Sequence, residues 1–262
     1  MSNIVFAEKA YDYLEKLGLE TAQAHLDQTS QTAAAESWSY TEFLGRLLDG
    51  ELAARLKNNI RIAYKMAHFP YLKKLEDFDF DAQPSIDKKL VDELATLRFV
   101  SEGRCLILLG PPGTGKTHLA IALATLIVEQ GKRAYFTTAS DMVRKLNKAM
   151  SENRLHRATQ MLVHPSLLVI DEVGYLQLDK AEASLLFQVI CKRYDKNQPI
   201  IITSNKAFSQ WGDIFANDPV MASAALDRLL HKSTVINIKG ESYRLKEKKK
   251  AGIPLEGGDI VS

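Results

Sequence analysis

Two hydrophobic patterns follow one another along the 262 residues of the chain. Up to about residue 68, apolar side chains recur three or four positions apart, as on one face of a helix, and no strong strand-like run is present. Thr41 and Glu42 form a typical helix start, and a further helix over 51–67 would stop at Pro70. We therefore predict a small all-helical N-terminal domain over residues 1–68.

Residues 69–103 are predicted to be a linker followed by one more helix. An alternating aromatic and acidic run over 77–81, with Pro84 behind it, suits a linker. An amphipathic pattern near 86–99 predicts the helix.

From Arg104 onward, short apolar runs alternate with helical patterns. This alternation predicts an α/β fold with a parallel sheet. The core is expected over 104–245, and a basic flexible tail over 246–262. The predicted strands are 104–109, 133–137, 167–171, 199–203 and 234–238.

Composition limits the partners only weakly. The 34 Lys and Arg nearly balance 32 Asp and Glu, so any surface for nucleic acid must be local. Cys105 and Cys191 lie in apolar patterns and are expected to be reduced core thiols. The apolar runs are too short to cross a bilayer, and the N-terminus lacks a signal-peptide pattern, which predicts a cytoplasmic protein with no membrane partner.

Residues 110–117 fit the phosphate-binding loop pattern G-x-x-x-x-G-K-[ST] at every fixed position. Glycines let the backbone turn with positive φ and bring N–H groups to a phosphate where a Cβ would collide. An apolar strand precedes the loop, and the helix after it favours the same anion. The predicted ATP-binding residues are Gly110, Pro111, Pro112, Gly113, Thr114, Gly115, Lys116, Thr117 and His118.

Two carboxylates end the apolar run over 167–170. In P-loop enzymes the first acid holds Mg²⁺ together with the hydroxyl of the loop, which predicts Thr117 and Asp171 as metal ligands. Lys116 would contact the β- and γ-phosphates, and Glu172 would activate the attacking water as a general base.

Two more residues are candidates for catalysis. Asn205 follows the fourth predicted strand and would orient the water if that strand lies between the first and third; otherwise it caps a turn. Arg228, in a helical pattern over 221–232, would reach the nucleotide of a neighbouring subunit as an arginine finger. The alternative is a surface arginine paired with Asp227.

Four segments together resemble the AAA+ ATPases, in the branch of replication initiators and helicase loaders: GPPGTGKTHLA, LLVIDEVGYL, ITSN and ALDRLLHKS. With the helical N-terminal part, the linker LEDFDF and the terminal SYR, residues of about 20 to 245 resemble the IstB family, the helper ATPases of insertion sequences. The resemblance implies a P-loop AAA+ core with a five-stranded parallel sheet. It also implies that Asp171 and Glu172 form the Walker B motif, that Asn205 is sensor 1, and that Arg228 is the arginine finger.

One departure from common AAA+ architecture affects the nucleotide site. Too few residues follow the last strand for a helical lid domain, so the lid is predicted to be absent or vestigial. Arg244 would do part of the work of the missing sensor 2 arginine. The position of the linker makes Phe78 and Phe80 candidates for the adenine pocket.

Two basic segments are candidates for contact with DNA phosphates. The first is a helical segment over 140–164, inserted between the second and third strands, and the second surrounds the helix over 51–67. In each, a solvated helix face is the alternative. The predicted DNA-binding residues are Arg144, Lys145, Lys148, Arg154 and Arg157 in the first, and Arg46, Arg55, Lys57, Arg61 and Lys65 in the second.

The resemblance implies an ATP-dependent regulator of transposition. Such a protein would form a homo-oligomer on target duplex DNA, remodel the DNA and recruit and stimulate a cognate transposase, while ATP hydrolysis controls assembly. A replicative helicase loader of the same branch is the alternative. A protein unfoldase is disfavoured, because the aromatic residue at its pore-loop position, Phe136, is expected inside a strand.

Overall fold

The computed structural model describes residues 2–175 and 177–243, so Arg244 and the predicted basic tail lie outside the described residues. The chain divides into two compact units, Met1–Ile62 and Ala63–Ser262. The boundary falls inside helix α3 (Tyr40–Ala67), a few residues before the predicted domain boundary at 68. The reason is that Ala63 and Ala67, in the last turns of α3, are buried in the hydrophobic core of the second unit.

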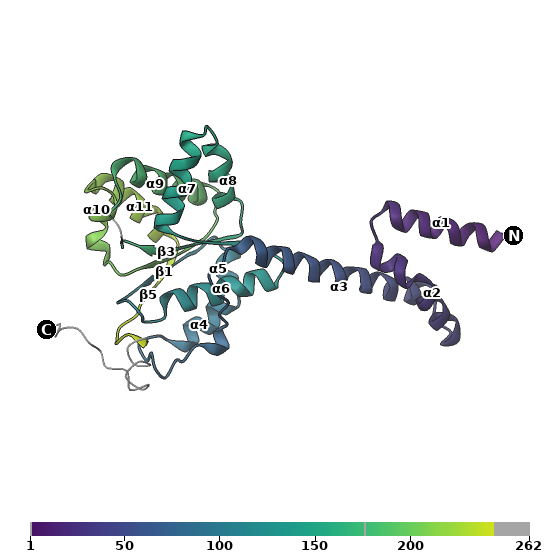
Figure 1. Ribbon diagram of the computed structural model, residues 1–262. Coiled ribbons are helices and arrows are strands. Elements are labelled where there is room, and N and C mark those ends of the chain that lie inside the picture. The colour runs from purple at the N-terminus through teal and green to yellow at the C-terminus, as the bar shows by residue number, and fades with distance from the viewer. Residues whose placement is uncertain (1, 176, 244–262) are drawn as a thin grey trace, which may run out of the picture. The chain divides into compact units, whose positions relative to one another are not determined.

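The first unit consists of α1 (Ser2–Lys16), α2 (Glu20–Ala35) and most of α3 (Figure 1). The expectation of two separate helices over 41–67 is wrong, because α3 is continuous. It begins one residue before Thr41, where the Ser39 hydroxyl accepts the N–H of Glu42 at 3.2 Å. Gly45 and Gly50 are weak helix formers, yet each interior glycine costs only about 1 kcal/mol and does not end the helix.

The second unit is built on one parallel five-stranded sheet, with the order β2-β3-β4-β1-β5. The fourth strand along the chain therefore lies between the first and third, as the candidate role of Asn205 required. All five strands were predicted within two residues at each end. Their bounds are β1 (Cys105–Leu109), β2 (Ala134–Thr138), β3 (Leu167–Val173), β4 (Ile200–Ser204) and β5 (Ser233–Asn237).

Helices cover both faces of this sheet (Figure 1), as expected for parallel strands that are apolar on both sides. One core cluster joins the sheet to α4 (Lys88–Ala95), α5 (Arg98–Ser101) and α6 (Lys116–Glu129). The other joins it to α7 (Ala139–Ser151), α9 (Lys180–Asp195), α10 (Trp211–Ile214) and α11 (Pro219–His231). Two short 3-10 helices, η1 (Leu75–Asp77) and η2 (Phe208–Gln210), lie in the loops.

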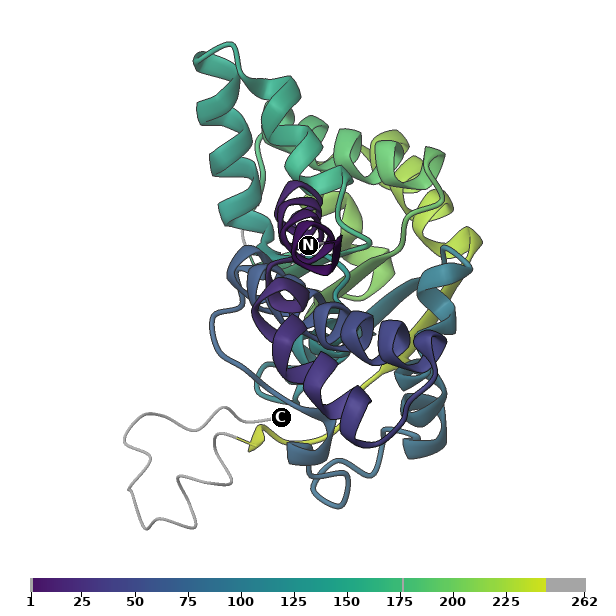
Figure 2. The same ribbon diagram turned by 90° about the vertical axis from the view of Figure 1, so that its right-hand side faces the viewer.

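Two predicted helices are each divided in two. The helix expected near 86–99 is α4 followed by α5, because Leu97 has a φ of 60° and interrupts the helical path. The segment over 140–164 is α7 and α8 (Leu155–Val163), which lie side by side in Figures 1 and 2. Met142 and Leu146 of α7 are buried in the core, so α7 is also the crossover helix between β2 and β3.

A buried arginine ties the entry of the third strand to that of the fourth. Arg193 of α9 is fully buried, and its guanidinium donates hydrogen bonds to four carbonyl oxygens. Burial lowers the pKa of Arg193 to about 9, so the side chain stays charged at neutral pH. The acceptors are Leu162 at 2.8 Å, Val163 at 3.4 Å, Pro165 at 3.1 Å and Pro199 at 2.6 Å.

No helix within residues 2–175 and 177–243 combines the length and the apolar character needed to cross a membrane.

Candidate functional site

The glycine loop joins β1 to α6 at the carboxyl edge of the sheet. Gly113 and Gly115 have φ values of 78° and 95°, which side chains with a Cβ rarely adopt. A Cβ on Gly115 would also lie 2.7 Å from the ring of Phe78. Both glycines are therefore required by the backbone and by close neighbours, as the loop pattern predicted.

Lys116 is buried at the first position of α6, and its ammonium donates to the carbonyl oxygens of Gly110 and Pro111, both at 2.7 Å. Thr114 donates from its hydroxyl to the same Pro111 carbonyl at 2.8 Å. These bonds turn the loop around the lysine. The positive charge is thus held at a helix N-terminus, where the helix dipole also favours an anion.

Thr117 and Asp171, the predicted metal ligands, are in direct contact. The Thr117 hydroxyl lies 2.9 Å and 3.1 Å from the two carboxylate oxygens of Asp171. Asp171 is buried, and it also accepts a 2.5 Å hydrogen bond from the hydroxyl of Thr203 on β4. The contact between the loop and β3 is what a P-loop magnesium site requires.

Glu172 lies where the pairing of β3 with β4 shifts register, between Ile170 and Val173. Its φ of 60° is unusual for a residue with a Cβ, and such strained positions cluster at functional sites. The Thr203 hydroxyl accepts the N–H of Glu172 at 3.0 Å and so replaces the missing strand contact. This irregularity leaves the Glu172 side chain exposed while Asp171 stays buried.

A cavity of about 340 Å³ begins at the glycine loop. The loop from Pro112 to His118 lines one part of it, with Glu172 and Thr203, while Phe78 and other residues of the linker line the rest. Phe78 packs its ring edge-on to His118, with centroids 5.1 Å apart, and burial lowers the pKa of that histidine. Phe80 packs on Phe78 but does not line this cavity.

These residues fit a nucleoside triphosphate with Mg²⁺. The glycines leave a cradle that a Cβ would fill, the lysine supplies the positive charge, and a hydroxyl and a carboxylate lie together beside it.

A second cavity, of about 450 Å³, lies on the other side of the two acids. Thr117, Asp171 and Glu172 line it together with Lys145 of α7. The Lys145 ammonium lies 3.5 Å from the hydroxyl of Tyr135. One residue predicted to contact DNA therefore faces the predicted catalytic acids.

Asn205 is placed apart from the glycine loop. It lines a separate cavity with Gly174, Tyr175 and Lys206, and its buried amide oxygen accepts no hydrogen bond within the described part of the chain. Thr203, two residues earlier, hydrogen-bonds to both acids, and the role expected for Asn205, to orient the attacking water, stays a prediction. Sequence reasoning missed Thr203, and the available signal was its position at the end of a strand next to β3.

Arg228 lines neither cavity at the glycine loop. Its guanidinium donates to the Ala224 carbonyl at 2.8 Å and lies 5.5 Å from the ring centre of Phe187. No ion pair with Asp227 is found among residues 2–175 and 177–243, which disfavours the alternative of a simple surface pair.

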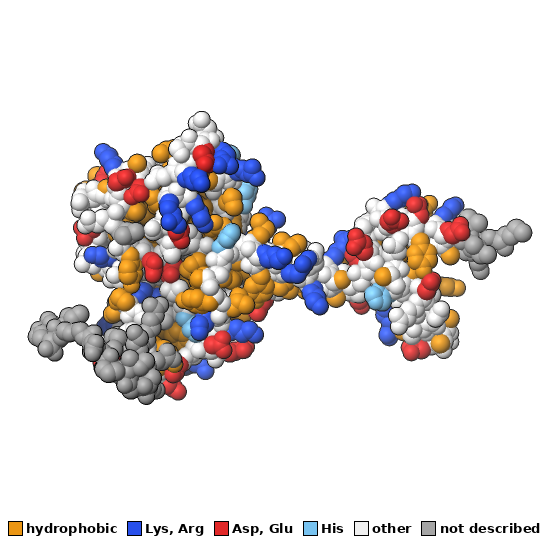
Figure 3. Space-filling view, viewed as in Figure 1, with side chains coloured by type: hydrophobic (Ala, Val, Ile, Leu, Met, Phe, Trp, Pro, Cys, Tyr) orange, Lys and Arg blue, Asp and Glu red, His pale blue; other side chains and the backbone are white. Residues whose placement is uncertain are grey.

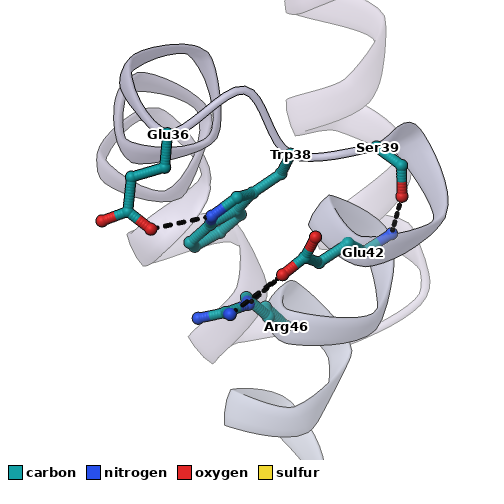
Figure 4. Close-up of polar contacts among 5 residues, drawn as sticks. All are labelled: Glu36, Trp38, Ser39, Glu42 and Arg46. Atoms are coloured by element: carbon teal, nitrogen blue, oxygen red, sulfur yellow. Dashed lines mark hydrogen bonds and ion pairs between the residues drawn. The ribbon is translucent and has the colours of Figure 1, made fainter.

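Two of the predicted DNA-binding residues of the first unit form ion pairs with acids of the same helix. Arg46 pairs with Glu42 at 2.9 Å and lies 4.0 Å above the ring of Trp38 (Figure 4). Arg55 pairs with the buried Glu51 at 2.8 Å and donates to a backbone carbonyl.

Glu51 was counted only as an acidic residue, but it caps a helix. Its carboxylate accepts the N–H groups of Thr21 and Ala22, at 2.9 Å and 3.1 Å, in the first turn of α2. The Arg55 guanidinium, with these two backbone donors, lowers the pKa of Glu51.

The other basic candidates are exposed on the helices where they were predicted. Figure 3 shows Lys and Arg side chains over the α7–α8 region and along α3. Arg61 donates to Asn58 at 2.8 Å, Arg144 pairs with Asp141 at 2.5 Å, and Arg154 pairs with Glu152. No ion pair in the described part of the chain involves Lys57, Lys65, Lys148 or Arg157.

Comparisons with known proteins match this picture. A family model described as IstB-like ATP binding protein matches residues 12–251. The ATP-binding protein of insertion sequence IS5376 from Geobacillus stearothermophilus is 44% identical over 242 residues, which cover 92% of this chain and 96% of that protein. The ATP-binding protein of insertion sequence IS21 from Pseudomonas aeruginosa is 48% identical over 240 residues, which cover 92% of this chain and 90% of that protein.

Solved structures share the fold. The crystal structure of the DnaC helicase loader matches with a TM-score of 0.50 and 24% identity, over 58% of this chain and 87% of that chain. The AMPPCP-bound structure of DnaA from Aquifex aeolicus matches with a TM-score of 0.52 and 18% identity, over 70% of this chain and 56% of that chain. At these identities the likeness concerns the AAA+ fold alone.

Proposed function

The chain belongs to the family of IstB-like ATP-binding proteins, and we propose that it is an ATPase that controls transposition of an insertion sequence. In this proposal, ATP supports assembly of a homo-oligomer on target duplex DNA, the oligomer remodels the DNA, and it recruits and stimulates a transposase. Hydrolysis then releases the assembly. The names of the relatives, which refer to ATP binding and insertion sequences, support the ATP and transposition parts.

The observation that carries the enzymatic part is the contact of Thr117 with Asp171 beside the glycine loop, with Glu172 next to them. Thr117 and Asp171 would hold Mg²⁺, which neutralises charge on the phosphates. Lys116 would bind the β- and γ-phosphates, and Glu172 would orient and deprotonate water. The strained backbone of Glu172 supports its role, because it turns this side chain toward the cavity.

Arg228 is proposed to act on the nucleotide of a neighbouring copy. Its absence from the lining of both cavities at its own glycine loop supports a role in trans. An arginine supplied in trans stabilises the charge of the transition state, and this is how hydrolysis would depend on assembly.

DNA contact is proposed mainly for Lys57, Lys65, Lys148 and Arg157, which are exposed. Lysine and arginine contacts to phosphates give affinity without base specificity and weaken as salt rises. Arg46 and Arg55 would have to leave their carboxylate partners to contribute, so they are the weaker candidates.

The enzymatic proposal is tested by Glu172→Gln, with Glu93→Gln on the exposed side of α4 as the matched control. We expect Glu172→Gln to keep ATP affinity and ATP-dependent assembly on DNA while turnover falls at least about 100-fold, the usual contribution of a general base. Normal turnover in this variant would refute the assignment of Glu172.

The nucleic-acid proposal is tested by titrating duplex and single-stranded DNA of equal length at fixed salt. Preference for the duplex supports target-DNA binding. A clear preference for single strands would refute it and favour the helicase-loader function.

A further inference from the structure

The cavity at the glycine loop has one end that is chemically defined. The phosphates of a nucleotide would bind at the glycine loop, because the backbone N–H groups of the loop and the Lys116 ammonium lie there. The remaining lining comes from the linker and from the residues after β5, and it includes Tyr71, Gln83 and Tyr243. A nucleotide held at the loop must direct its base toward this end.

Gln83 is the buried polar residue of that end. Its side chain is only 3% exposed, although it lies in a loop between η1 and α4. A turn holds the backbone: the Gln83 N–H donates to the Phe80 carbonyl, and the Gln83 carbonyl accepts the N–H of Ile86, both at 3.1 Å. Burying an amide is costly unless it makes hydrogen bonds, so its placement at a cavity needs a reason.

The segment that follows β5, residues 238–243, is tied on both sides of this amide. The Ser85 hydroxyl both donates to the carbonyl and accepts the N–H of Lys239, each at 2.9 Å. The N–H of Tyr243 donates to the carbonyl of Gly113 in the glycine loop, also at 2.9 Å. The segment therefore links the linker to the phosphate loop and passes directly beside Gln83.

This segment fixes which way the Gln83 amide points. Its amide nitrogen donates to the backbone carbonyl of Glu241 at 3.4 Å. A flipped amide would place its oxygen against that carbonyl oxygen, and two acceptors repel. Gln83 lines the cavity and its amide oxygen accepts no hydrogen bond from any described residue, so this acceptor and the second N–H remain for a ligand.

A fixed glutamine amide distinguishes the two purines. Adenine offers an amino donor beside a ring-nitrogen acceptor, and a glutamine can satisfy both at once. Guanine carries a carbonyl oxygen at the same position, which would face the oxygen of an amide that cannot flip. An amide held in one orientation therefore selects adenine.

We propose that Gln83 is the residue that selects adenine over guanine in the nucleotide bound at the glycine loop. The inference rests on the proposed binding of ATP. It also gives the segment 238–243 a function: this segment orients the base-reading amide where a lid domain would otherwise contribute. From the usual value of a bidentate amide contact, the preference for ATP over GTP is expected to be roughly 10-fold to 100-fold.

The test is competition binding to the full-length protein with Mg²⁺, read from the fluorescence of a ribose-labelled ATP analogue. The unlabelled competitors are ATP, GTP and purine riboside triphosphate, which lacks the amino group of adenine. The variants are Gln83→Leu and, as a matched control, Gln188→Leu on the exposed side of α9. This readout is binding and does not depend on turnover.

We expect the wild type and Gln188→Leu to prefer ATP over GTP by the factor above, and to prefer ATP over purine riboside triphosphate by a smaller factor, because that competitor keeps the ring-nitrogen acceptor. Gln83→Leu should bind ATP at least as weakly as the wild type binds purine riboside triphosphate, because the substitution removes both amide contacts, and it should no longer distinguish these two nucleotides. GTP affinity should not fall in this variant. Comparing the affinities of the wild type for ATP and for purine riboside triphosphate needs no variant. This comparison therefore tests the inference even if Gln83→Leu fails to fold.

Three results would overturn the inference: equal wild-type affinity for ATP and purine riboside triphosphate, an unchanged preference in Gln83→Leu, or an equal fall for all nucleotides. Each of these leaves ATP binding itself standing. If the wild type binds no nucleotide, the proposed function fails as well, so the two failures are distinguishable.

Discussion

Thr203 offers a sharp test of how Asp171 and Glu172, the two acids of the proposed site, are held. Thr203 is only 1% exposed, and its hydroxyl makes two hydrogen bonds, one donated to the Asp171 carboxylate at 2.5 Å and one accepted from the Glu172 N–H at 3.0 Å. Thr203→Val keeps the shape and removes both bonds. Thr203→Ser keeps both bonds and removes one buried methyl group.

The two substitutions are expected to differ in free energy of unfolding. A hydrogen bond to a charged group contributes about 1.5 to 3 kcal/mol and a neutral one about 0.5 to 1.5 kcal/mol, so Thr203→Val should cost about 3 kcal/mol. Loss of one buried methyl group costs about 1 kcal/mol. For a unit of this size, the corresponding falls in melting temperature are roughly 6 to 12 °C and 2 to 4 °C.

Urea denaturation followed by circular dichroism measures these costs, and ATP turnover measures the placement of Glu172. Thr203→Val should reduce turnover much more than ATP affinity, because the substitution releases the backbone of the general base and leaves the glycine loop in place. Thr203→Ser should stay near the wild type in both assays. If Thr203→Ser were the less stable variant, packing volume rather than the hydroxyl would decide stability here, and the reasoning would be refuted.

Three further predictions concern other parts of the chain. Lys145→Ala should lower ATP turnover and leave DNA affinity within about two-fold, because Lys145 lines the cavity beside Asp171 and Glu172. Lys148→Ala should weaken DNA binding and reduce its salt slope by about one, as measured by titration at several salt concentrations. The reverse outcome would contradict the placement of Lys145 beside the acids and of Lys148 on DNA. Arg193→Met should lower the free energy of unfolding by about 3 kcal/mol in urea, because it leaves buried carbonyl oxygens without donors, and an unchanged midpoint would argue against that role. Because the pKa of Glu51 is lowered in the folded state, its carboxylate should stabilise the first unit at neutral pH. This stabilisation should decrease once the pH falls below the unfolded-state pKa of glutamate, about 4.3, and should be lost below the lowered pKa of the folded state. Glu51→Gln should lack this acid dependence in hydrogen exchange at Thr21 and Ala22, and an acid profile identical to the wild type would contradict the capping role of Glu51.

The sheet and the glycine loop could be predicted because local sequence determines them. Buried parallel strands are apolar on both faces and stand out as short runs. The loop needs glycine at positions such as 113 and 115, where φ is positive, so its pattern survives in the sequence. The contact of Thr117 with Asp171 followed from the same pattern, because each residue ends or follows a strand at one edge of the sheet.

What could not be predicted depends on neighbours that are distant along the chain. The hydrogen bonds of Thr203 to both acids depend on the register shift between β3 and β4, and the position of Thr203 at the end of a strand is only a weak signal of them. By contrast, the ion pairs of Arg46 and Arg55 are local and were missed although the sequence shows them, because in both pairs the acid lies four residues before the arginine. Gln83 meets Glu241 across 158 positions, and nothing in either segment indicates the contact.

The carboxyl end of β4 connects the phosphate loop to Glu172, the proposed general base. Consecutive residues at its carboxyl end contact both halves of the site: the Ser204 carbonyl accepts the N–H of Gly110 at 3.1 Å, and the Thr203 hydroxyl accepts that of Glu172. The chain then continues into α10 and α11, which pack together, and α11 carries Arg228. A displacement of the carboxyl end of β4 would therefore move the phosphate loop and Glu172 together, because both are bonded to the same strand end.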